Sequence, residues 1–480
     1  METQERILGG VLGLAVGDAL GVPIEFSERN ALRRKPVTGM QGGGYHRQPA
    51  GTWSDDTSLA MCLLESLLAA GFSPQDAGRR FVDWRDSNYW TARGSVFDVG
   101  GATGEAIDRM KRGTPAVQAG GKGEKDNGNG SLMRILPASI YFARSPRAMA
   151  ARAVSQFSAI THDHPRSRLA CVLFSRIVAG LLEGEDPSVA LLEAGARGAA
   201  LTEDAVELKH FGLLLQPDLA RLPEGKIASG GYVVDTLTAA VWCLLGTQSF
   251  SDCVLRAVNL GGDTDTTGAV AGALAGLRYG AGSIPADWTD ALARTEEIRE
   301  RAGRLHSLCA AAPAFADSYW ILPGKLLAGE YPGARKAEEA ERKLKSLLEA
   351  GVNFVVDLTE EGERAGGAPL LSYHGLLDHR CEVARCPMPD GGIPGLDKVR
   401  QALDLLDEAL AKGRTAYVHC WGGHGRTGVV AGCWLQRHGL ADSQSVLEIL
   451  AQLRKHMPDA GRLSPETEGQ RRMAQKWGRR

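Results

Sequence analysis

The sequence predicts two domains of different class: an all-α domain over residues 1–310, a linker at 311–320, and an α/β domain with a central parallel sheet over 321–480. Three observations lead to this prediction. The length of 480 residues exceeds what one compact core usually holds. Apolar residues keep a helical spacing through the first 310 residues, without alternating strand patterns. After residue 320, short β-branched runs alternate with amphipathic helices, which is typical of parallel sheets.

The composition is that of a globular protein and excludes several classes. Hydrophobic residues make up 44% and charged residues 23%, which argues against disorder, collagen and coiled coil. The formal net charge of −2 provides no basic field for nucleic acid or an anionic membrane, so we expect small or specific partners. We see no uninterrupted apolar run of a membrane span's length, and acids stand in segment 1–5 where a signal peptide needs positive charge. We therefore expect a cytoplasmic protein and leave its oligomeric state open.

The nine cysteines are scattered, odd in number and without a C-x-x-C pair. This pattern is not that of a disulfide framework or a zinc site. We expect buried thiols and one nucleophile.

Small residues accompany the helical spacing in the first domain. In segment 6–20 apolar residues keep a helical period while glycine recurs every fourth residue, which leaves a flat face for a neighbouring helix. The same pattern of apolar residues at helical spacing, accompanied by small residues, predicts further helices at 59–70, 169–182, 232–246 and 268–278. Two glycine-rich segments, 39–51 and 119–130, interrupt these helices. Long loops inside a compact domain are usually functional.

The second domain follows a connector at 311–315. A charged amphipathic helix is predicted at 337–350 and a short β-branched strand at 352–358. Another helix is predicted at 396–411, and a strand at 416–419 runs directly into a glycine-rich loop. This alternation predicts the parallel sheet.

Two acidic clusters precede apolar helices in the first domain, at 51–57 and 261–268. Either cluster alone is consistent with capping of a helix N-terminus, but a cap uses one side-chain oxygen, and four carboxylates crowd these two helix starts. Like charges at this density repel unless a cation lies among them. Hard oxygen ligands without His or Cys select Mg²⁺ or Mn²⁺ over zinc, so two facing clusters could hold two ions.

The clusters belong to a series of motifs, which in chain order are Gly17-Asp18-Ala-Leu-Gly21-Val-Pro23-Ile-Glu25, Ser54-Asp55-Asp56, Phe97-Asp98-Val-Gly100, Asn127-Gly-Asn129-Gly130-Ser131-Leu-Met133-Arg134, Thr161-His162 and Gly262-Asp263-Thr-Asp265-Thr266. Together they resemble the ADP-ribosylglycohydrolase family over about residues 5–305. The resemblance implies an all-α fold that binds two Mg²⁺ or Mn²⁺ ions beside the ribose. It implies these metal ligands: Ser54, Asp55, Asp56, Asp263, Asp265 and Thr266.

Glu25 and Asp98 are the candidate catalytic carboxylates of this domain. Cleavage of an ADP-ribosyl bond requires stabilisation of an oxocarbenium-like centre and activation of water. A surface ion pair is the alternative for Glu25. The glycine-rich loop offers backbone N–H groups that can cradle a diphosphate. The residues expected to contact substrate are Asn127, Gly128, Gly130, Ser131, Met133 and His162, with a plain surface histidine as the alternative for His162.

A strong catalytic signal follows strand 416–419, in the segment His419-Cys420-Trp-Gly-Gly-His-Gly425-Arg426-Thr427-Gly428. Five residues separate Cys420 from Arg426, and such a loop at a helix start wraps its backbone N–H groups around an oxyanion. The helix dipole and the arginine favour a thiolate nucleophile. A buried cysteine in a glycine turn is the alternative, but it does not explain glycines clustered beside an arginine. We expect the oxyanion to contact Gly422, Gly423 and Gly425.

This segment resembles the signature of dual-specificity and tyrosine phosphatases, over about residues 319–475. The resemblance implies that Cys420 attacks phosphorus, Arg426 clamps the equatorial oxygens and Thr427 eases release of the thiolate. A general acid must protonate the leaving oxygen, and Asp390 in the proline-rich segment 387–394 is the predicted acid. Ordinary turn chemistry is the alternative for an aspartate in such a loop. This domain is expected to need no cofactor.

The whole sequence therefore predicts a bifunctional hydrolase that removes ADP-ribose from a modified substrate and hydrolyses phosphoesters through a cysteinyl-phosphate intermediate. The alternative is a catalytically silent ADP-ribose-binding domain that targets an active phosphatase. A third interpretation has both domains acting in sequence on one phosphorylated ADP-ribose derivative. The attachment atom (an arginine nitrogen, a serine oxygen or a small molecule), the phosphatase substrate and the choice between Mg²⁺ and Mn²⁺ stay open.

Overall fold

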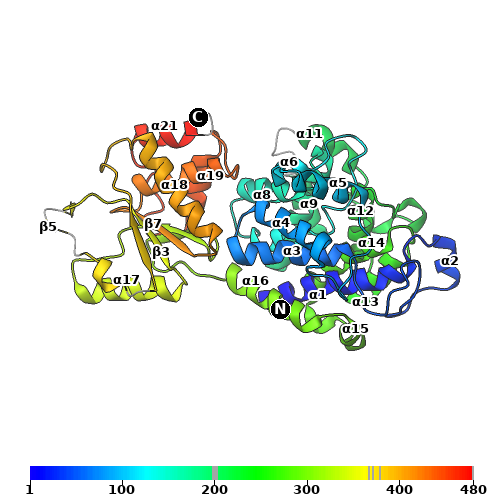
Figure 1. Cartoon of the computed structure of the whole chain (residues 1–480). Coiled ribbons are helices and arrows are strands. Elements are labelled where there is room, and N and C mark those ends of the chain that lie inside the picture. The colour runs from blue at the N-terminus through cyan, green and yellow to red at the C-terminus, as the bar shows by residue number, and fades with distance from the viewer. Residues whose placement is uncertain (197–203, 366–367, 370–371, 378–379, 478–480) are drawn as a thin grey trace. The chain divides into compact units, whose positions relative to one another are not determined.

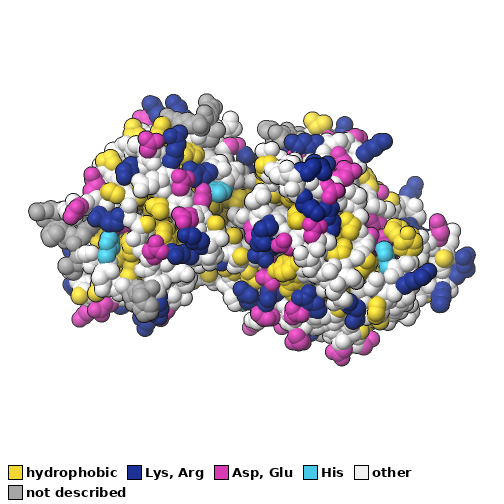
Figure 2. Space-filling model, viewed as in Figure 1, with side chains coloured by type: hydrophobic (Ala, Val, Ile, Leu, Met, Phe, Trp, Pro, Cys, Tyr) yellow, Lys and Arg dark blue, Asp and Glu magenta, His cyan; other side chains and the backbone are white. Residues whose placement is uncertain are grey.

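The structure, a computed structural model, describes residues 1–196, 204–365, 368–369, 372–377 and 380–477. It contains two compact units, of which the first holds most of the chain up to Ser307 and the second the chain from Leu308 (Figure 1). On the face shown in Figure 2, basic and acidic side chains are interspersed over both units. The predicted two-domain architecture is confirmed.

The first unit is helical, as predicted. Its helices are α1 (Thr3–Gly21), α2 (Arg29–Arg34), α3 (Asp55–Ala70), α4 (Pro74–Ser87), α5 (Gly101–Lys111), α6 (Ala116–Ala119), α7 (Leu136–Tyr141), α8 (Arg147–Ala159), α9 (Pro165–Glu183), α10 (Pro187–Ala196), α11 (Asp204–Glu207), α12 (Val233–Leu245), α13 (Phe250–Val258), α14 (Thr264–Tyr279), α15 (Ala286–Ala291) and α16 (Thr295–Cys309). Between them, the described residues form isolated β-bridges and no strand. The acidic clusters stand where α3 and α14 begin.

Helices α1 and α14 run antiparallel in close contact because glycines line both facing surfaces. A Cβ atom on Gly17 would lie 2.0 Å from the carbonyl oxygen of Gly268. One on Gly21 would lie 2.4 Å from the Cα of Asp265. No side chain fits at either position, so the two backbones touch. The contact brings the C-terminal end of α1, with Asp18, beside the N-terminal end of α14 and its acidic cluster.

The segment Thr3–Ile24, which comprises α1 and the turn after it, is long and apolar enough to cross a membrane. The sequence analysis predicted a helix at 6–20 but did not consider this segment as a candidate membrane span. However, 89% of its most apolar window is buried inside the structure, mainly against α14. Burial of this kind is that of a core helix, and length and hydropathy alone are weak indicators of a span.

The second unit is built on a five-stranded sheet of order β1-β2-β7-β3-β6. The strands are β1 (Ser318–Leu322), β2 (Leu326–Gly329), β3 (Phe354–Asp357), β6 (Glu382–Arg385) and β7 (Ala416–His419), with a separate short pair β4 (Arg364–Ala365) and β5 (Ala368–Pro369). The helices are α17 (Ala337–Glu349), α18 (Leu396–Ala411), α19 (Arg426–Arg437), α20 (Val446–Leu453) and α21 (Glu468–Lys476).

The sheet is mixed, which corrects the prediction of a parallel sheet. Strands β2, β7, β3 and β6 run parallel, but β1 pairs with β2 antiparallel. Only the short turn 323–325 joins β1 to β2, and a parallel pair needs a crossover of a dozen or more residues. Strand β1 also begins at Ser318, inside the segment 311–320 that we expected to be a linker.

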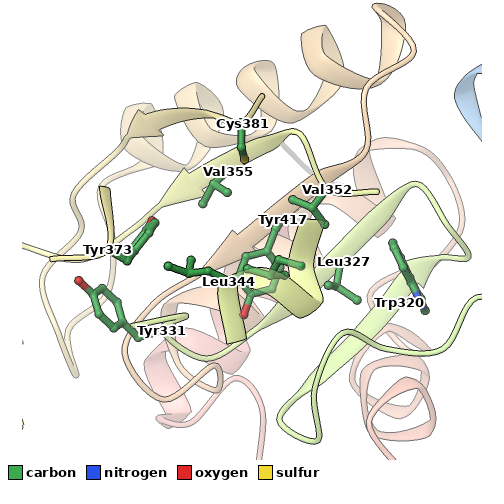
Figure 3. Packing of buried hydrophobic residues seen from close by; sticks show 10 residues of the cluster. Trp320, Leu327, Tyr331, Leu344, Val352, Val355, Tyr373, Cys381 and Tyr417 are labelled. Atoms are coloured by element: carbon green, nitrogen blue, oxygen red, sulfur yellow. The ribbon is translucent and has the colours of Figure 1, made fainter. Parts of the chain in front are cut away.

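Helix α17 covers one face of this sheet. Its Leu344 and Leu347 pack in a core cluster with Tyr331, Tyr373 and Tyr417, as Figure 3 shows for Leu344 and the three tyrosines. The amphipathic pattern that predicted this helix therefore marks its buried face. Because β3 and β7 are parallel, both end at the same edge of the sheet, where ligands usually bind in α/β folds.

Candidate active sites

The two acidic clusters of the first unit meet, although 210 residues separate the contacting side chains. The hydroxyl of Thr266 donates a hydrogen bond to Asp56 Oδ2 at 3.3 Å, which joins the start of α14 to the start of α3. The hydroxyl of Ser54 donates to the same oxygen at 3.2 Å. Asp55 and Asp265 are buried beside them, while Asp263 is partly exposed. Hydrogen bonds thus join Ser54, Asp56 and Thr266, and the carboxylates of Asp55, Asp263 and Asp265 lie close enough to act electrostatically on this group.

Burial makes the charged forms of these carboxyls unfavourable. Loss of solvation raises the pKa of Asp55, Asp56 and Asp265 well above the usual range, and repulsion from neighbouring carboxylates raises it further. A divalent cation would oppose both effects by supplying positive charge among the oxygens.

Two oxygens of this cluster lack hydrogen-bond partners in the part of the chain that the structure describes. They are Oδ1 of Asp56 and Oδ1 of Asp263, one from each acidic loop, and both atoms are buried. Unpaired buried oxygens are costly in a folded protein. The residues therefore fit a hard divalent cation, which prefers carboxylate and hydroxyl oxygens.

Asp18, which was not predicted as a site residue, organises the first acidic loop. Its fully buried carboxylate accepts hydrogen bonds from the backbone N–H groups of Ser54 and Thr57, at 2.9 and 3.0 Å, and from the Thr57 hydroxyl at 2.6 Å. Burial raises the pKa of Asp18 to about 6 although these bonds act in the opposite direction. An aspartate inside the apolar segment 6–20 was the available signal, because buried charges need partners.

Glu25 and Asp98 lie beside the acidic loops. Burial and neighbouring carboxylates raise the pKa of both carboxyls, that of Glu25 to about 9. His46 Nε2 is hydrogen-bonded to Glu25 Oε2 at 2.5 Å, and polar atoms of Glu25, His46 and Asp98 all lie within 4.8 Å of one another. His46 was missed because a single histidine in the glycine-rich segment 39–51 has no diagnostic spacing.

The glycine-rich loop that contains Gly128 and Gly130 leaves space for the ring of His162. A Cβ atom on Gly130 would lie 2.8 Å from His162 Cε1, and one on Gly128 would lie 3.3 Å from Nε2. His162 is 2% exposed, so the alternative of a surface histidine is wrong. Burial lowers the pKa of His162 to about 3, and the ring is therefore neutral near pH 7. Among the described residues no backbone carbonyl accepts a hydrogen bond from the N–H groups of Gly130 and Ser131, and Gly130 is partly exposed whereas Ser131 is fully buried.

Other predicted substrate contacts are engaged inside the protein. The side chains of Asn127 and Ser131 form internal hydrogen bonds, and Met133 is buried. Instead, Asn129 Nδ2 donates to Asp263 Oδ2 at 2.9 Å and ties the glycine-rich loop to the second acidic loop. This contact sets the loop beside the candidate metal ligands.

In the second unit, Cys420 follows β7 directly and is 3% exposed. The loop after it leads into α19 at Arg426. Within the described chain, no acceptor pairs with the backbone N–H groups of residues 421–426. A row of unpaired N–H groups at a helix N-terminus can bind an oxyanion.

The glycines of this loop have different roles. Gly423 has a φ of +72°, and a Cβ atom there would lie 2.7 Å from the backbone nitrogen of Glu330, so only glycine fits. Added Cβ atoms on Gly422 and Gly425 would meet side chains at 3.2 and 3.1 Å. The hydroxyl of Thr427 donates to the Gly329 carbonyl at 3.4 Å. Its role in thiolate release stays a prediction.

Two carboxylates hold the guanidinium of Arg426, which is almost fully buried. Glu363 accepts hydrogen bonds from Nη1 at 2.7 Å and Nη2 at 2.5 Å, and Asp390 Oδ1 lies 2.9 Å from Nη2. Although burial acts in the opposite direction, these interactions raise the pKa of Arg426, and the Arg426 bonds lower that of Glu363. Arg426 Nε is buried without a partner among the described residues, so this edge is available to a phosphate oxygen.

His424 attaches the cysteine loop to a segment that follows α20. Its Nε2 lies 2.8 Å from Asp459 Oδ2 and its Nδ1 lies 2.7 Å from Arg454 Nη2. The pairing of Glu363 with Arg426 and the role of Asp459 were not predicted, because each residue is one acid among many in the second half of the sequence. Asp390, the predicted acid, is brought to Arg426 by the proline-rich loop.

Known proteins resemble both units. The family model described as ADP-ribosylglycohydrolase matches residues 1–314, and the model described as "Polymorphic toxin system, DSP-PTPase phosphatase" matches 330–440. ADP-ribosylarginine hydrolase Tri1 of Serratia proteamaculans is 34% identical over 307 residues, which cover 63% of this chain and 80% of that protein. ADP-ribosyl-[dinitrogen reductase] glycohydrolase of Rhodospirillum rubrum is 35% identical over 316 residues, covering 64% and 97%.

A solved "ADP-ribosylglycohydrolase-related protein complex" has a TM-score of 0.55 and 36% identity, and the match covers 64% of this chain and 99% of that chain. The first family model spans the helical unit in which the acidic loops meet, and the second spans the cysteine loop. This chain therefore belongs to the ADP-ribosylglycohydrolase family and carries a phosphatase-like domain after its glycohydrolase domain.

Proposed function

We propose that the chain is a bifunctional enzyme that releases ADP-ribose from arginine side chains and hydrolyses phosphomonoesters. The observation that carries the first activity is the contact between Thr266 and Asp56, which joins two acidic loops with an unpaired oxygen on each. The name of the Serratia proteamaculans relative supports an arginine-linked substrate. A complete set of oxygen ligands argues against a silent ADP-ribose-binding domain.

In the proposed glycohydrolase reaction the C–N bond to the ribose breaks, and water supplies the new C–O bond. Two Mg²⁺ or Mn²⁺ ions would be held by Ser54, Asp55, Asp56, Asp263, Asp265 and Thr266, and would supply Lewis-acid chemistry beside the ribose. The backbone N–H groups of Gly130 and Ser131 bind the diphosphate. Glu25, which is largely buried and hydrogen-bonded to His46, donates a proton to the departing nitrogen. Asp98 accepts the proton of the attacking water.

In the proposed phosphatase reaction the Cys420 thiolate attacks phosphorus and forms a cysteinyl-phosphate intermediate. The backbone N–H groups of 421–426 and the Nε edge of Arg426 stabilise the equatorial oxygens. Asp390 protonates the leaving oxygen and then deprotonates the water that hydrolyses the intermediate.

Product analysis of the full chain tests the glycohydrolase assignment. Peptides carrying ADP-ribose on arginine or on serine are incubated with Mg²⁺, Mn²⁺ or a chelator, and released ADP-ribose is quantified. We expect metal-dependent release from arginine. Asp265→Asn should lower the rate by more than about 100-fold, since even outer-shell changes at metal sites cost about 10–100-fold.

Asp290→Asn, an exposed acid in the same unit, is the matched control and should retain the wild-type rate. Chelator-insensitive release would contradict the metal assignment. Saturable binding of ADP-ribose without release from any peptide would favour the silent binding domain. Release from serine alone would contradict the arginine linkage and keep the hydrolase.

A further inference from the structure

A ring cluster stands beside Glu25, outside the acidic loops, and consists of Phe26, Tyr45, His46 and Phe97. Phe26 and Tyr45 meet edge to face, with centroids 5.0 Å apart and planes at 87°. The ring of His46 packs on Tyr45 at 5.0 Å and on Phe97 at 5.2 Å. The rings come from three separate loops, so the fold assembles the cluster.

The two outer rings are exposed to solvent. Phe26 is 59% exposed and Tyr45 is 70% exposed, whereas the side chain of His46 beneath them is 10% exposed. Phe26 also has a φ of +63°, in the left-handed region that residues other than glycine rarely adopt. Residues held in such conformations cluster at ligand sites, and adjoining exposed aromatic rings are typical of binding surfaces.

The carboxylates beside this surface favour a cationic ligand. Three carboxylates, those of Asp98, Asp263 and Asp18, act electrostatically on Glu25, to which His46 is hydrogen-bonded. Aromatic faces are negatively polarised and attract a cation that lies within about 6 Å of the ring centroid. A guanidinium suits such a surface better than a metal ion does, because it is planar and weakly hydrated, whereas divalent ions retain oxygen ligands.

The proposed orientation of the substrate determines where its cationic group would lie. Asn129 attaches the glycine-rich loop, with the proposed diphosphate contacts, to Asp263. His46 attaches the ring cluster to Glu25. The ring cluster thus adjoins Glu25, the proposed proton donor for the leaving group, whereas the loop with the proposed diphosphate contacts adjoins Asp263.

We infer that Phe26 and Tyr45 form the recognition surface for the guanidinium of the ADP-ribosylated arginine and so help to select arginine over serine. The inference rests on the proposed arginine-linked substrate and names residues that recognise it. A serine leaving group presents no cation to the rings. ADP-ribose itself has no leaving group and does not need them.

Variants that change the rings without removing apolar bulk test this inference. Tyr45→Leu and Phe26→Leu keep an apolar side chain but lose the π face, and Tyr45→Phe keeps the ring. Each variant of the full chain is assayed for KM and kcat on an arginine-linked peptide and for inhibition by ADP-ribose. Exposed cation–π contacts are worth about 0.5–1 kcal/mol, which corresponds to about a 2- to 5-fold rise in KM for each leucine variant.

We expect kcat, and the inhibition constant of ADP-ribose, to stay at the wild-type values, and Tyr45→Phe to behave as wild type. An unchanged KM in Tyr45→Leu would overturn the inference and leave the arginine hydrolase standing. Equal weakening of ADP-ribose inhibition would also overturn it, because the rings would then belong to the ADP-ribose side. Failure of the wild type to cleave arginine-linked peptides would instead refute the proposed function. Because Tyr45 is exposed, its variants also answer the question if Phe26→Leu does not fold.

Discussion

Arg426 shows how one buried cation is prepared for an anion. Its Nη atoms are paired with Glu363 and, at Nη2, also with Asp390, while Nε has no partner among the described residues. The two carboxylates thus fix the orientation in which Nε would meet a phosphate oxygen. A bidentate pair of this kind gives geometric specificity as well as energy. We therefore propose Glu363 as a positioning residue for the proposed phosphatase reaction.

We expect Glu363→Gln to lower phosphatase activity by about 10–100-fold, because small misplacements of a positioning group have effects of this size. Steady-state kinetics should show a higher KM together with a lower kcat, since Arg426 contacts the bound phosphate in every state. Glu361→Gln, two residues away and exposed, is the matched control. ADP-ribose release should not change. Wild-type phosphatase kinetics in Glu363→Gln would remove the positioning role.

The buried ring of His162 predicts a pH-dependent stability. Its pKa is about 3 in the folded protein and 6.5 in the reference state, so the unfolded chain binds more protons between these values. The contribution of His162 to stability is therefore complete above pH 6.5 and is lost as the pH falls toward 3. When the pH falls from 7 to 4.5, the free energy of unfolding of the wild type should decrease by on the order of 2 kcal/mol more than that of His162→Gln. Denaturant unfolding of both proteins at several pH values, with chelator present, measures this difference. If the free energy of unfolding depended on pH equally in both proteins, the buried neutral ring would be contradicted.

At this scale the sequence indicated the residues whose types cluster in motifs. The acidic loops and the cysteine loop each combine several diagnostic residues within a few positions. Asp18, His46 and Glu363 act alone in their segments, and their roles depend on contacts across 36, 21 and 63 residues. No local pattern reports such pairings, so they could be found only from the fold.

At the scale of elements, the contact between α1 and α14 determines where the acidic groups lie. Glycine recurs along both facing surfaces, and the carbonyl groups of one helix approach the Cα atoms of the other. The contact holds Asp18 near Asp265 and thereby links helix packing to the candidate metal site. The glycine period in the sequence predicted a flat face on the helix at 6–20, but only the structure identified α14 as the helix that packs against it.

Gly17→Ala should destabilise the helical unit, because the new Cβ atom would lie 2.0 Å from the Gly268 oxygen and the helices would have to separate. Overpacking of this kind typically costs about 1–3 kcal/mol. Gly303→Ala in α16 is the matched control, since an added Cβ atom there meets nothing within 4 Å. It should stabilise by about 0.5–1 kcal/mol, as replacement of a helix glycine usually does. Thermal unfolding distinguishes the two, and a neutral Gly17→Ala would show that the helices can move apart freely.

The second unit shows what element prediction could not reach. The patterns predicted the amphipathic helix at 337–350 and the strand before the cysteine loop, because each carries a regular period and a clear end. The first three residues of β1, 318–320, were placed in the predicted linker. All five residues of this strand are buried, so no alternation marks it as a strand. Its antiparallel pairing depends on a short turn, which sequence spacing alone did not reveal.

At the scale of the whole molecule, both sites depend on the start of a helix. The first acidic loop leads into α3, the second leads into α14, and the cysteine loop leads into α19. The chemistry of the loops differs, however, because carboxylates attract cations whereas unpaired N–H groups attract anions. The sequence could predict this division into two units because every motif lies within one of them.

The two proposed activities should be separable in the intact chain. The proposed phosphatase reaction uses a thiolate and no metal, so Cys420→Ser should abolish phosphoester hydrolysis and leave ADP-ribose release at the wild-type rate. Chelation, or Asp265→Asn, should have the opposite effect. Cys309→Ser, a partly exposed cysteine, is the matched control for the thiol and should retain both activities. Parallel assays on one preparation provide the measurement. If a single substitution silenced both activities, the sites would depend on each other, and the interpretation with one phosphorylated ADP-ribose substrate would then explain the result better.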